Sequence, residues 1–177
     1  MKNKITILFT ILYLSISIII AQTPLKVIST TITFKIKNAG LNVTGSFKGF
    51  EGEIKFDPEL LKTSFIKASV DANTINTGIT SRDNHLKKEE YFDVVKYPKI
   101  SIVSSFFGKE GNKFRGYFKL NMKGVTKDIV IPFIFEINTM KGEFTFDRRD
   151  FKIGGNSMVM GDKVTVSIQI NLSKANL

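Results

Sequence analysis

The chain of 177 residues has no cysteine, no tryptophan and a single histidine, His85. Without cysteine there can be no disulfide, no thiolate metal site and no lipid-modified N-terminal cysteine. One histidine is poor material for a zinc or copper site, and the 16 acidic residues lack the loop spacing of a calcium motif. The sequence therefore predicts no metal site and no cofactor.

Motifs of covalent catalysis are also missing from the sequence. There is no Gly-x-Ser-x-Gly nucleophile elbow and no phosphate-binding loop ending in Gly-Lys-Ser/Thr. Ser81, Asp83 and His85 are the residue types of a nucleophilic triad. On a helix, however, Asp83 points away from the face that Ser81 and His85 share, so it cannot orient the imidazole. We therefore predict no catalytic residues and expect that the protein is not an enzyme.

The one long hydrophobic run is at the N-terminus. Residues 1–4 are basic, and residues 5–21 are apolar apart from a few hydroxyl-bearing side chains. This is the form of a secretory signal peptide with cleavage near Ala21. It predicts a signal at 1–21 and one mature domain at 22–177, in the periplasm or secreted. The alternative is an uncleaved anchor, because a spanning helix needs roughly 20 apolar residues.

The chain has an excess of positive charge. Loss of residues 1–21 removes two lysines and no acid, which lowers the formal net charge from +10 to +8. Such an excess can attract nucleic acid, anionic lipid or an anionic small molecule. Export argues against nucleic acid, and most lysines alternate with apolar residues, as expected of a solvated outer face. A transient contact with an anionic membrane surface stays open as a hypothesis.

From Ile32 onward the chain alternates apolar and polar side chains, as strands with one buried face do. The alternation predicts about eight hairpin-linked antiparallel strands. Within residues 43–56 the apolar phase shifts by one residue, which predicts a bulge at Gly49. The strands can stack as a sandwich or close into a barrel, and the bulge favours the barrel.

An outer-membrane barrel would show the same alternation, with its apolar face turned to lipid. The absence of tryptophan, the four tyrosines and a long insertion between the third and fourth strands disfavour it. This insertion covers residues 77–98. Thr80 followed by Asp83 resembles a capping box, so we predict a helix over 81–90 that lies across one barrel end.

The insertion carries the candidates for contact with a ligand head group, which are Arg82, Asp83 and His85. For His85 the alternative is packing against the barrel rim.

The 16 phenylalanines occur largely on the inward phase of the predicted strands. They can fill the barrel completely or line an apolar tunnel, and the pattern leaves both open. Gly45, Gly52 and Gly116 on the same phase could make room for a ligand, and the alternative is that they relieve crowding in a solid core. The candidate tunnel-lining residues are Phe34, Ile36, Phe47, Phe50, Ile54, Val70, Ile102, Phe106, Phe114, Gly116, Phe118, Phe144, Val166 and Ile168.

Several motifs match a known family. They are Val70-Asp-Ala-x-Thr-Ile-Asn-Thr77, Ser81-Arg-Asp-x-His-Leu86, Tyr91-Phe-Asp-Val-x-Lys-Tyr-Pro98, Leu120-x-x-Lys-Gly-Val-Thr-Lys127 and Arg149-x-Phe-x-Ile-Gly154. In them the sequence resembles the YceI-like family of secreted bacterial lipid-binding proteins. The resemblance implies an all-β, eight-stranded, lipocalin-like antiparallel barrel with a helical insertion, usually a homodimer, that holds a polyisoprenoid lipid. It implies no catalytic residues.

Together these observations predict a periplasmic carrier that sequesters a prenyl quinone or a polyprenyl phosphate in its barrel. Two alternatives stay open. One is an enzyme that acts on a prenyl substrate, with Asp83, His85 or Tyr97 as acid or base. The other is an interaction protein with a basic surface and a solid core.

Overall fold

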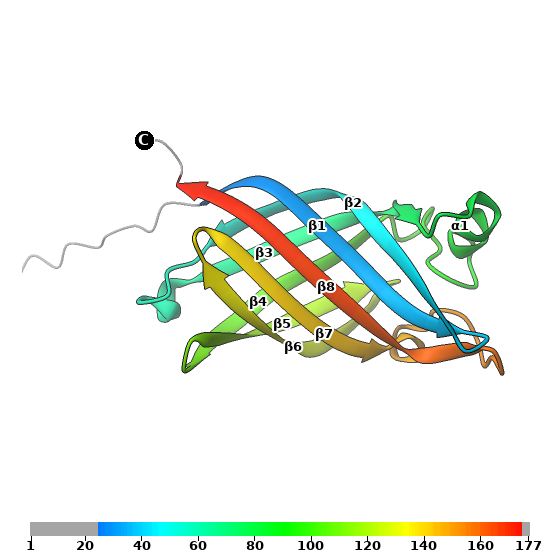
Figure 1. Cartoon of the computed structure of the whole chain (residues 1–177). Helices are drawn as coiled ribbons and strands as arrows, with labels where there is room; N and C mark the ends of the chain where they lie inside the picture. Colours follow the sequence, from blue (N-terminus) through cyan, green and yellow to red (C-terminus); the bar gives the residue numbers. More distant parts are fainter. Residues whose placement is uncertain (1–24, 175–177) are drawn as a thin grey trace, which may run out of the picture.

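The computed structural model describes residues 25–174, which form a closed antiparallel barrel with the strands in sequence order (Figure 1). The strands are β1 (Leu25–Asn38), β2 (Leu41–Lys55), β3 (Phe65–Asn76), β4 (Lys99–Glu110), β5 (Lys113–Met122), β6 (Val125–Glu136), β7 (Thr139–Asp147) and β8 (Met160–Lys174). Pairing of β1 with β8 closes the barrel. The predicted eight-stranded barrel is confirmed, and the sandwich is wrong. The predicted signal peptide lies outside the described residues.

The insertion between β3 and β4 contains one short helix, α1 (Thr80–Leu86). The predicted capping box is wrong, because the Asp83 carboxylate accepts hydrogen bonds from the amide and the hydroxyl of Thr77 instead. The helix therefore begins after Ile79 without a side-chain cap. It also ends at Leu86, earlier than predicted, and turns follow as far as Lys96. We call residues 78–97 the lid segment; Figure 1 shows it at one end of the barrel.

Two bulges set which side chains point into the barrel. The predicted bulge at Gly49 is confirmed: this residue has φ +70°, and the β2–β3 register shifts on either side of Lys48. A second bulge was not predicted. The β4–β5 register shifts between Ser104 and Phe106, so that Phe107 is buried and Phe106 is 57% exposed. The placement of Phe106 in the interior is therefore wrong, since the bulge moves it to the outer face.

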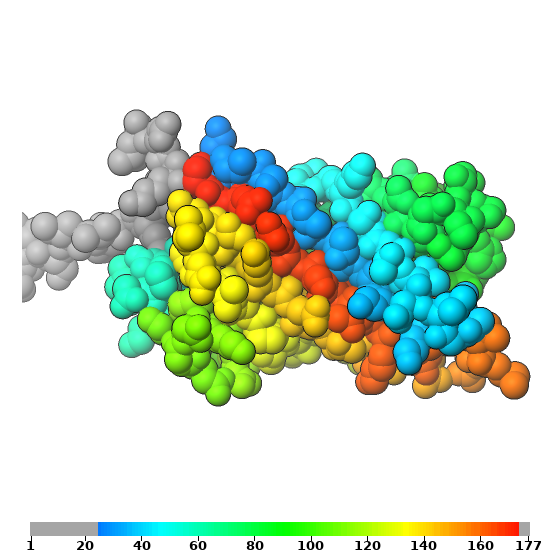
Figure 2. Space-filling model, in the orientation of Figure 1, coloured from blue at the N-terminus to red at the C-terminus, as the bar shows by residue number. Residues whose placement is uncertain are grey.

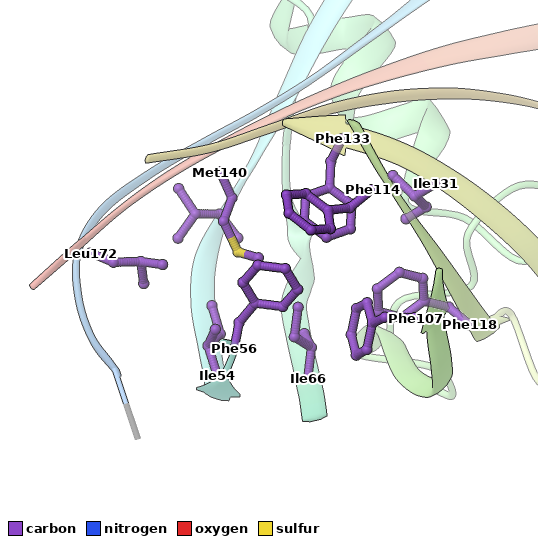
Figure 3. Packing of buried hydrophobic residues seen from close by; sticks show 11 residues of the cluster. Ile54, Phe56, Ile66, Phe107, Phe114, Phe118, Ile131, Phe133, Met140 and Leu172 are labelled. Atoms are coloured by element: carbon purple, nitrogen blue, oxygen red, sulfur yellow. The ribbon is translucent and has the colours of Figure 1, made fainter. Parts of the chain in front are cut away.

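The end of the barrel opposite the lid segment is filled by aromatic side chains. The Phe56 ring makes edge contacts with the rings of Phe107, Phe114, Phe133 and Phe135, at centroid distances of 5.2 to 5.5 Å. Figure 3 shows Phe56 with the first three of these rings. Aliphatic residues, including Ile54, Ile66 and Leu172, complete this cluster. We call it the aromatic plug. Because its members other than the partly buried Phe135 are 0 to 8% exposed, the barrel is solid at this end.

We expect Phe56→Ala to lower the free energy of unfolding by about 3 to 5 kcal/mol, because it leaves a cavity among rings that cannot collapse into it. Phe106→Ala is the matched control. It removes an exposed ring stacked on Tyr117 and should cost only about 0.5 to 1.5 kcal/mol. Denaturant unfolding of both variants measures the difference. Equal losses of unfolding free energy in the two variants would contradict both the plug and the second bulge.

Candidate ligand-binding cavity

Between the aromatic plug and the lid segment the barrel encloses an apolar cavity with a volume of about 230 Å³. It runs from Phe133 and Met140, beside the plug, to Asn38, Thr77 and Arg82 at the lid end. We call this lid end the cavity mouth. Inward residues of β1 and β8 that face the cavity, such as Phe34 and Ile168, are only half-buried, because they border empty space.

Most of the predicted tunnel-lining residues border this cavity. They are Phe34, Ile36, Phe47, Phe50, Val70, Ile102, Phe118, Phe144, Val166 and Ile168. The other four do not. Ile54 and Phe114 belong to the aromatic plug, Phe106 faces outward, and Gly116 lies beneath the ring of Phe118.

The inward glycines make room for protein side chains and not for a ligand. A Cβ at Gly45 would lie 2.3 Å from the Phe34 ring, and a Cβ at Gly116 would lie 2.3 Å from the Phe118 ring. Gly52 is needed for close approach of strands, since its Cβ would meet the Lys67 carbonyl at 2.7 Å. The expectation that these glycines widen the cavity is therefore wrong. Neighbouring rings occupy the space beside Gly45 and Gly116, and the adjacent strand β3 occupies it beside Gly52.

Residues from outside the strands close the cavity at its mouth. Leu86, Tyr91 and Phe92 of the lid segment border the cavity, and the Phe92 ring lies edge-on to Phe47 of β2 at 5.6 Å. The alternation of apolar and polar residues does not identify these side chains, because they lie outside the strands. Two adjacent aromatics at 91 and 92 in an otherwise charged segment were the signal that could have identified them, because such a pair must pack against something apolar.

Two tyrosines hold the lid segment on the barrel, each over a glycine. The Tyr97 ring lies against Gly124 of the β5–β6 turn, where a Cβ would come within 2.7 Å of it. The Tyr91 ring lies against Gly154, whose amide donates to the Glu90 carbonyl. Both contacts join motifs that are far apart in the sequence. They explain why aromatic and glycine positions occur together in these motifs.

The three predicted head-group residues have different roles in the structure. Arg82 borders the cavity, and its guanidinium donates from Nε and Nη2 to the hydroxyl and carbonyl of Thr77. Asp83 is used to orient Thr77, and the exposed His85 ring packs against Tyr91 at 4.9 Å. Neither Asp83 nor His85 borders the cavity. Arg82 is therefore the candidate with access to a ligand, and its Nη1 makes no hydrogen bond to any residue in 25–174.

Arg148, in the short helix η2 (Arg148–Phe151), is a buried cation that the sequence analysis did not select. It donates hydrogen bonds to the carbonyls of Ile153, Gly155 and Gly161 and forms an ion pair with Asp162 at 2.8 Å. Although it borders the cavity, its donors are used by the protein. Its guanidinium holds the loop between η2 and β8 in place by donating to several of the loop's carbonyls.

Lys123 is another cation at the mouth, in the β5–β6 turn. It donates to the Lys152 carbonyl at 2.8 Å and does not border the cavity. Burial lowers the pKa of its ammonium, while the charges of Asp93, Glu89 and Glu90 oppose that shift. It joins the turn to the loop after η2.

The described residues bring together neither a catalytic triad nor a metal site. Asp83 bonds to Thr77 and the His85 ring contacts Tyr91, so no chain of hydrogen bonds links Ser81, Asp83 and His85 in the part of the chain described. Among residues 25–174 there is also no group of three histidine, aspartate or glutamate side chains that could hold a metal ion. The same residues include no helix long and apolar enough to cross a membrane.

The pairing of β1 with β2 is interrupted along part of its length. Leu25 pairs with Ile54, and the next pair toward the mouth is Ile32 with Phe47. A shallow recess lies at this interruption, lined in part by Val27 and Phe50. Because Phe50 also borders the main cavity, its ring separates the cavity from the recess.

The fold and this cavity define a class of protein: a closed antiparallel β-barrel whose apolar interior is plugged at one end and covered by a lid at the other. The chain belongs to the YceI-like family, since the model of the YceI-like domain matches residues 25–172.

Curated relatives match over part of the chain. A UPF0312 protein of Photorhabdus laumondii is 31% identical over 101 residues, which are 56% of this chain and 53% of that protein. Protein YceI of Salmonella arizonae is 29% identical over the same shares. The matched region thus spans about half the length of these relatives.

Solved structures share the fold. BcnA of Burkholderia cenocepacia superposes with a TM-score of 0.76 at 23% identity, covering 80% of this chain and 94% of BcnA. A polyisoprenoid-binding domain from Saccharophagus degradans superposes with a TM-score of 0.64 at 14% identity, covering 86% and 98% of the two chains.

We expect Arg148→Met to lower the free energy of unfolding by about 3 to 5 kcal/mol, because it leaves loop carbonyls and Asp162 without their donor. Its neighbour Arg149 is half-exposed and pairs with Asp162 at 3.1 Å, so Arg149→Met should cost less than about 1 kcal/mol. Denaturant unfolding and limited proteolysis of the loop at 153–159 measure the two effects. A loop equally resistant to protease in both variants would contradict this role of Arg148.

Proposed function

We propose that the protein binds the chain of a polyisoprenoid lipid in its cavity and carries it through the periplasm, without chemical conversion. The observation that carries this proposal is an apolar cavity, plugged at one end by aromatic rings, whose mouth holds the partly exposed Arg82. Apolar cavities of this kind stay dry and bind apolar molecules. The polyisoprenoid-binding domain with the same fold supports the class of ligand.

The lipid chain should supply most of the affinity. Each buried methylene contributes about 0.8 kcal/mol, so one five-carbon isoprene unit approaches about 3 to 4 kcal/mol before ordering costs. Arg82 is partly exposed, and one such cation contributes about 1 kcal/mol or less. The arginine therefore orients the head group at the mouth, where a quinone carbonyl or a phosphate oxygen can accept from its free guanidinium donors.

Catalysis on a prenyl substrate is the second candidate, and the geometry favours carriage over it. Of the residues suggested as acid or base, Asp83 is bonded to Thr77, His85 packs on Tyr91, and Tyr97 lies over Gly124. None of the three borders the cavity. The polar side chains that border the cavity include Asn38, Thr77, Arg82, Tyr91 and Arg148, and no carboxylate, histidine or lysine that could serve as a general base is among the residues bordering it.

The proposal also includes the location of the protein in the periplasm, its assembly as a homodimer and its transient contact with a membrane. The signal-like residues 1–21 support export to the periplasm. An exposed apolar strip on the outer face of β4, β5 and β6, formed by Phe106, Tyr117 and Val130, supports association as a homodimer. The positive net charge supports a transient contact with an anionic membrane.

Filling the cavity tests the proposal most directly. In the wild type we expect native mass spectrometry, after mild purification, to show a bound mass of prenyl size. Val166→Trp should abolish this mass, because Val166 borders the cavity and the new ring occupies the space of the chain. Gln169→Trp, on the outer face of the same strand, should leave binding unchanged. A folded Val166→Trp protein with its full complement of lipid would contradict binding in the cavity.

Removal of the cation at the mouth tests the head-group contact. We expect Arg82→Ala to weaken binding of a prenyl phosphate by about fivefold, the equivalent of about 1 kcal/mol. Binding of the prenyl alcohol of the same length should change little, because it carries no charge. Lys87→Ala, one turn further along the lid segment, is the control. Fluorescence titration with both ligands gives the ratio, and equal losses for both would rule out a role of Arg82 in head-group recognition.

A further inference from the structure

We propose that the protein docks on an anionic lipid bilayer through one side of the cavity mouth, where the β1–β2 hairpin and the loop before β8 meet. The apolar side chains at this place are Leu41, Met158 and Val159, and we call them the docking tip. This inference rests on the proposed function and deepens it, since it names the surface at which the cavity takes up its lipid.

The three side chains of the docking tip belong to one exposed unit. Leu41 is 74% exposed, Val159 is 60% exposed, and Met158 is fully exposed. The Ala39 amide donates to the Val159 carbonyl at 2.7 Å, which joins the hairpin to the loop. Figure 2 shows the two segments side by side at the end of the molecule that also carries the lid segment. Large apolar side chains gathered on such a surface indicate an interaction site.

The docking tip is continuous with the lining of the cavity. Asn38, which precedes the hairpin turn, pairs with Met160, the first residue of β8, and both border the cavity. They are within three residues of Leu41, Met158 and Val159 in the chain. A lipid chain that leaves a bilayer at the docking tip therefore reaches cavity-lining residues without crossing the outer face of the barrel.

Charges beside the docking tip favour an anionic surface. Lys35 and Lys37 on β1 and Lys163 on β8 are exposed next to it. Two acidic side chains on the adjoining strands, Asp147 and Asp162, are paired with Arg149 at 4.0 and 3.1 Å, and Asp162 also pairs with Arg148. Each lysine near an anionic membrane surface adds about 1 kcal/mol of attraction, which is about fivefold in binding.

The lid segment makes another side of the mouth, and its charges are less suited to an anionic surface. The four acids of the lid segment balance its four cations, which are Arg82, Lys87, Lys88 and Lys96. Three of these acids, Glu89, Glu90 and Asp93, also act on the ammonium of Lys123. Contact with an anionic bilayer is therefore more favourable on the side of the docking tip than on the lid. This sets the orientation of the barrel, with the hairpin and the loop against the lipid.

A bilayer fits this surface better than a protein partner does. A stable protein interface buries more than about 1,000 Å², which three side chains on two turns cannot supply. Apolar side chains flanked by lysines are, in contrast, the usual composition of segments that insert at a membrane interface. The ligand also belongs in a bilayer, because a free polyisoprenoid is insoluble in water.

Flotation with vesicles tests the inference. Residues 22–177 are used, because residues 25–174 close the barrel by themselves and the apolar run at 5–21 would itself bind lipid. The probes are vesicles of phosphatidylcholine with and without phosphatidylglycerol. We expect binding to the anionic vesicles only, and Leu41→Ser/Met158→Ser/Val159→Ser should lower it at least about tenfold. Lys37→Ser/Lys163→Ser should also lower it, and added salt should weaken wild-type binding.

The matched control is Leu60→Ser/Ile137→Ser, which removes two exposed apolar side chains at the plugged end and should leave flotation unchanged. Binding of a prenyl alcohol in solution, without vesicles, is measured in parallel. We expect the docking-tip variant to retain it. If the wild type takes up no prenyl alcohol, the proposed function fails, whatever the vesicles show.

Three results would overturn docking while leaving the proposed function intact. The wild type could bind prenyl alcohol but no anionic vesicles. The control variant could lose as much vesicle binding as the docking-tip variant. Finally, a wild-type dimer that ignores vesicles and becomes a monomer in the docking-tip variant would show that this surface joins two copies of the chain.

Discussion

The packing of aromatic rings around Phe56 is the constraint on which the rest of the structure depends. An eight-stranded barrel is only just wide enough to be filled by its own side chains. Here the rings fill one end and leave the other end hollow. Because the plug closes one end, access to the cavity is concentrated at the lid end. The polar contacts, the lid and the proposed docking surface all gather there.

At the mouth, two kinds of contact hold the irregular segments in place. Tyr91 and Tyr97 attach the lid segment to glycines of two separate loops, and Arg148 gathers the loop before β8 around its guanidinium. These contacts leave Arg82 as the cation available to a ligand. These contacts hold the segments at the mouth in place without filling the cavity. The cavity can therefore still bind an apolar chain.

Individual residues show which structural features the sequence pattern can predict and which it cannot. Alternation identified most of the cavity lining and the bulge at Gly49, because a phase shift within one strand is visible in the sequence. The second bulge was invisible, since the adjacent Phe106 and Phe107 satisfy either phase and only pairing with β5 decides between them. The same limit applies to Gly116, whose free space is taken by Phe118. The predicted capping box does not form, because the Asp83 carboxylate accepts its hydrogen bonds from Thr77 instead.

By itself, the sequence determined the strands, their number, the insertion between β3 and β4 and the family, because these follow from local periodicity and from motifs. Only the tertiary structure decided which phenylalanines form a plug and which line a cavity, that Arg148 is buried, and that the Ala39 amide bonds to the Val159 carbonyl at the mouth. These features depend on distances between residues far apart in the chain. Such distances are set when the barrel closes, and no local pattern contains them.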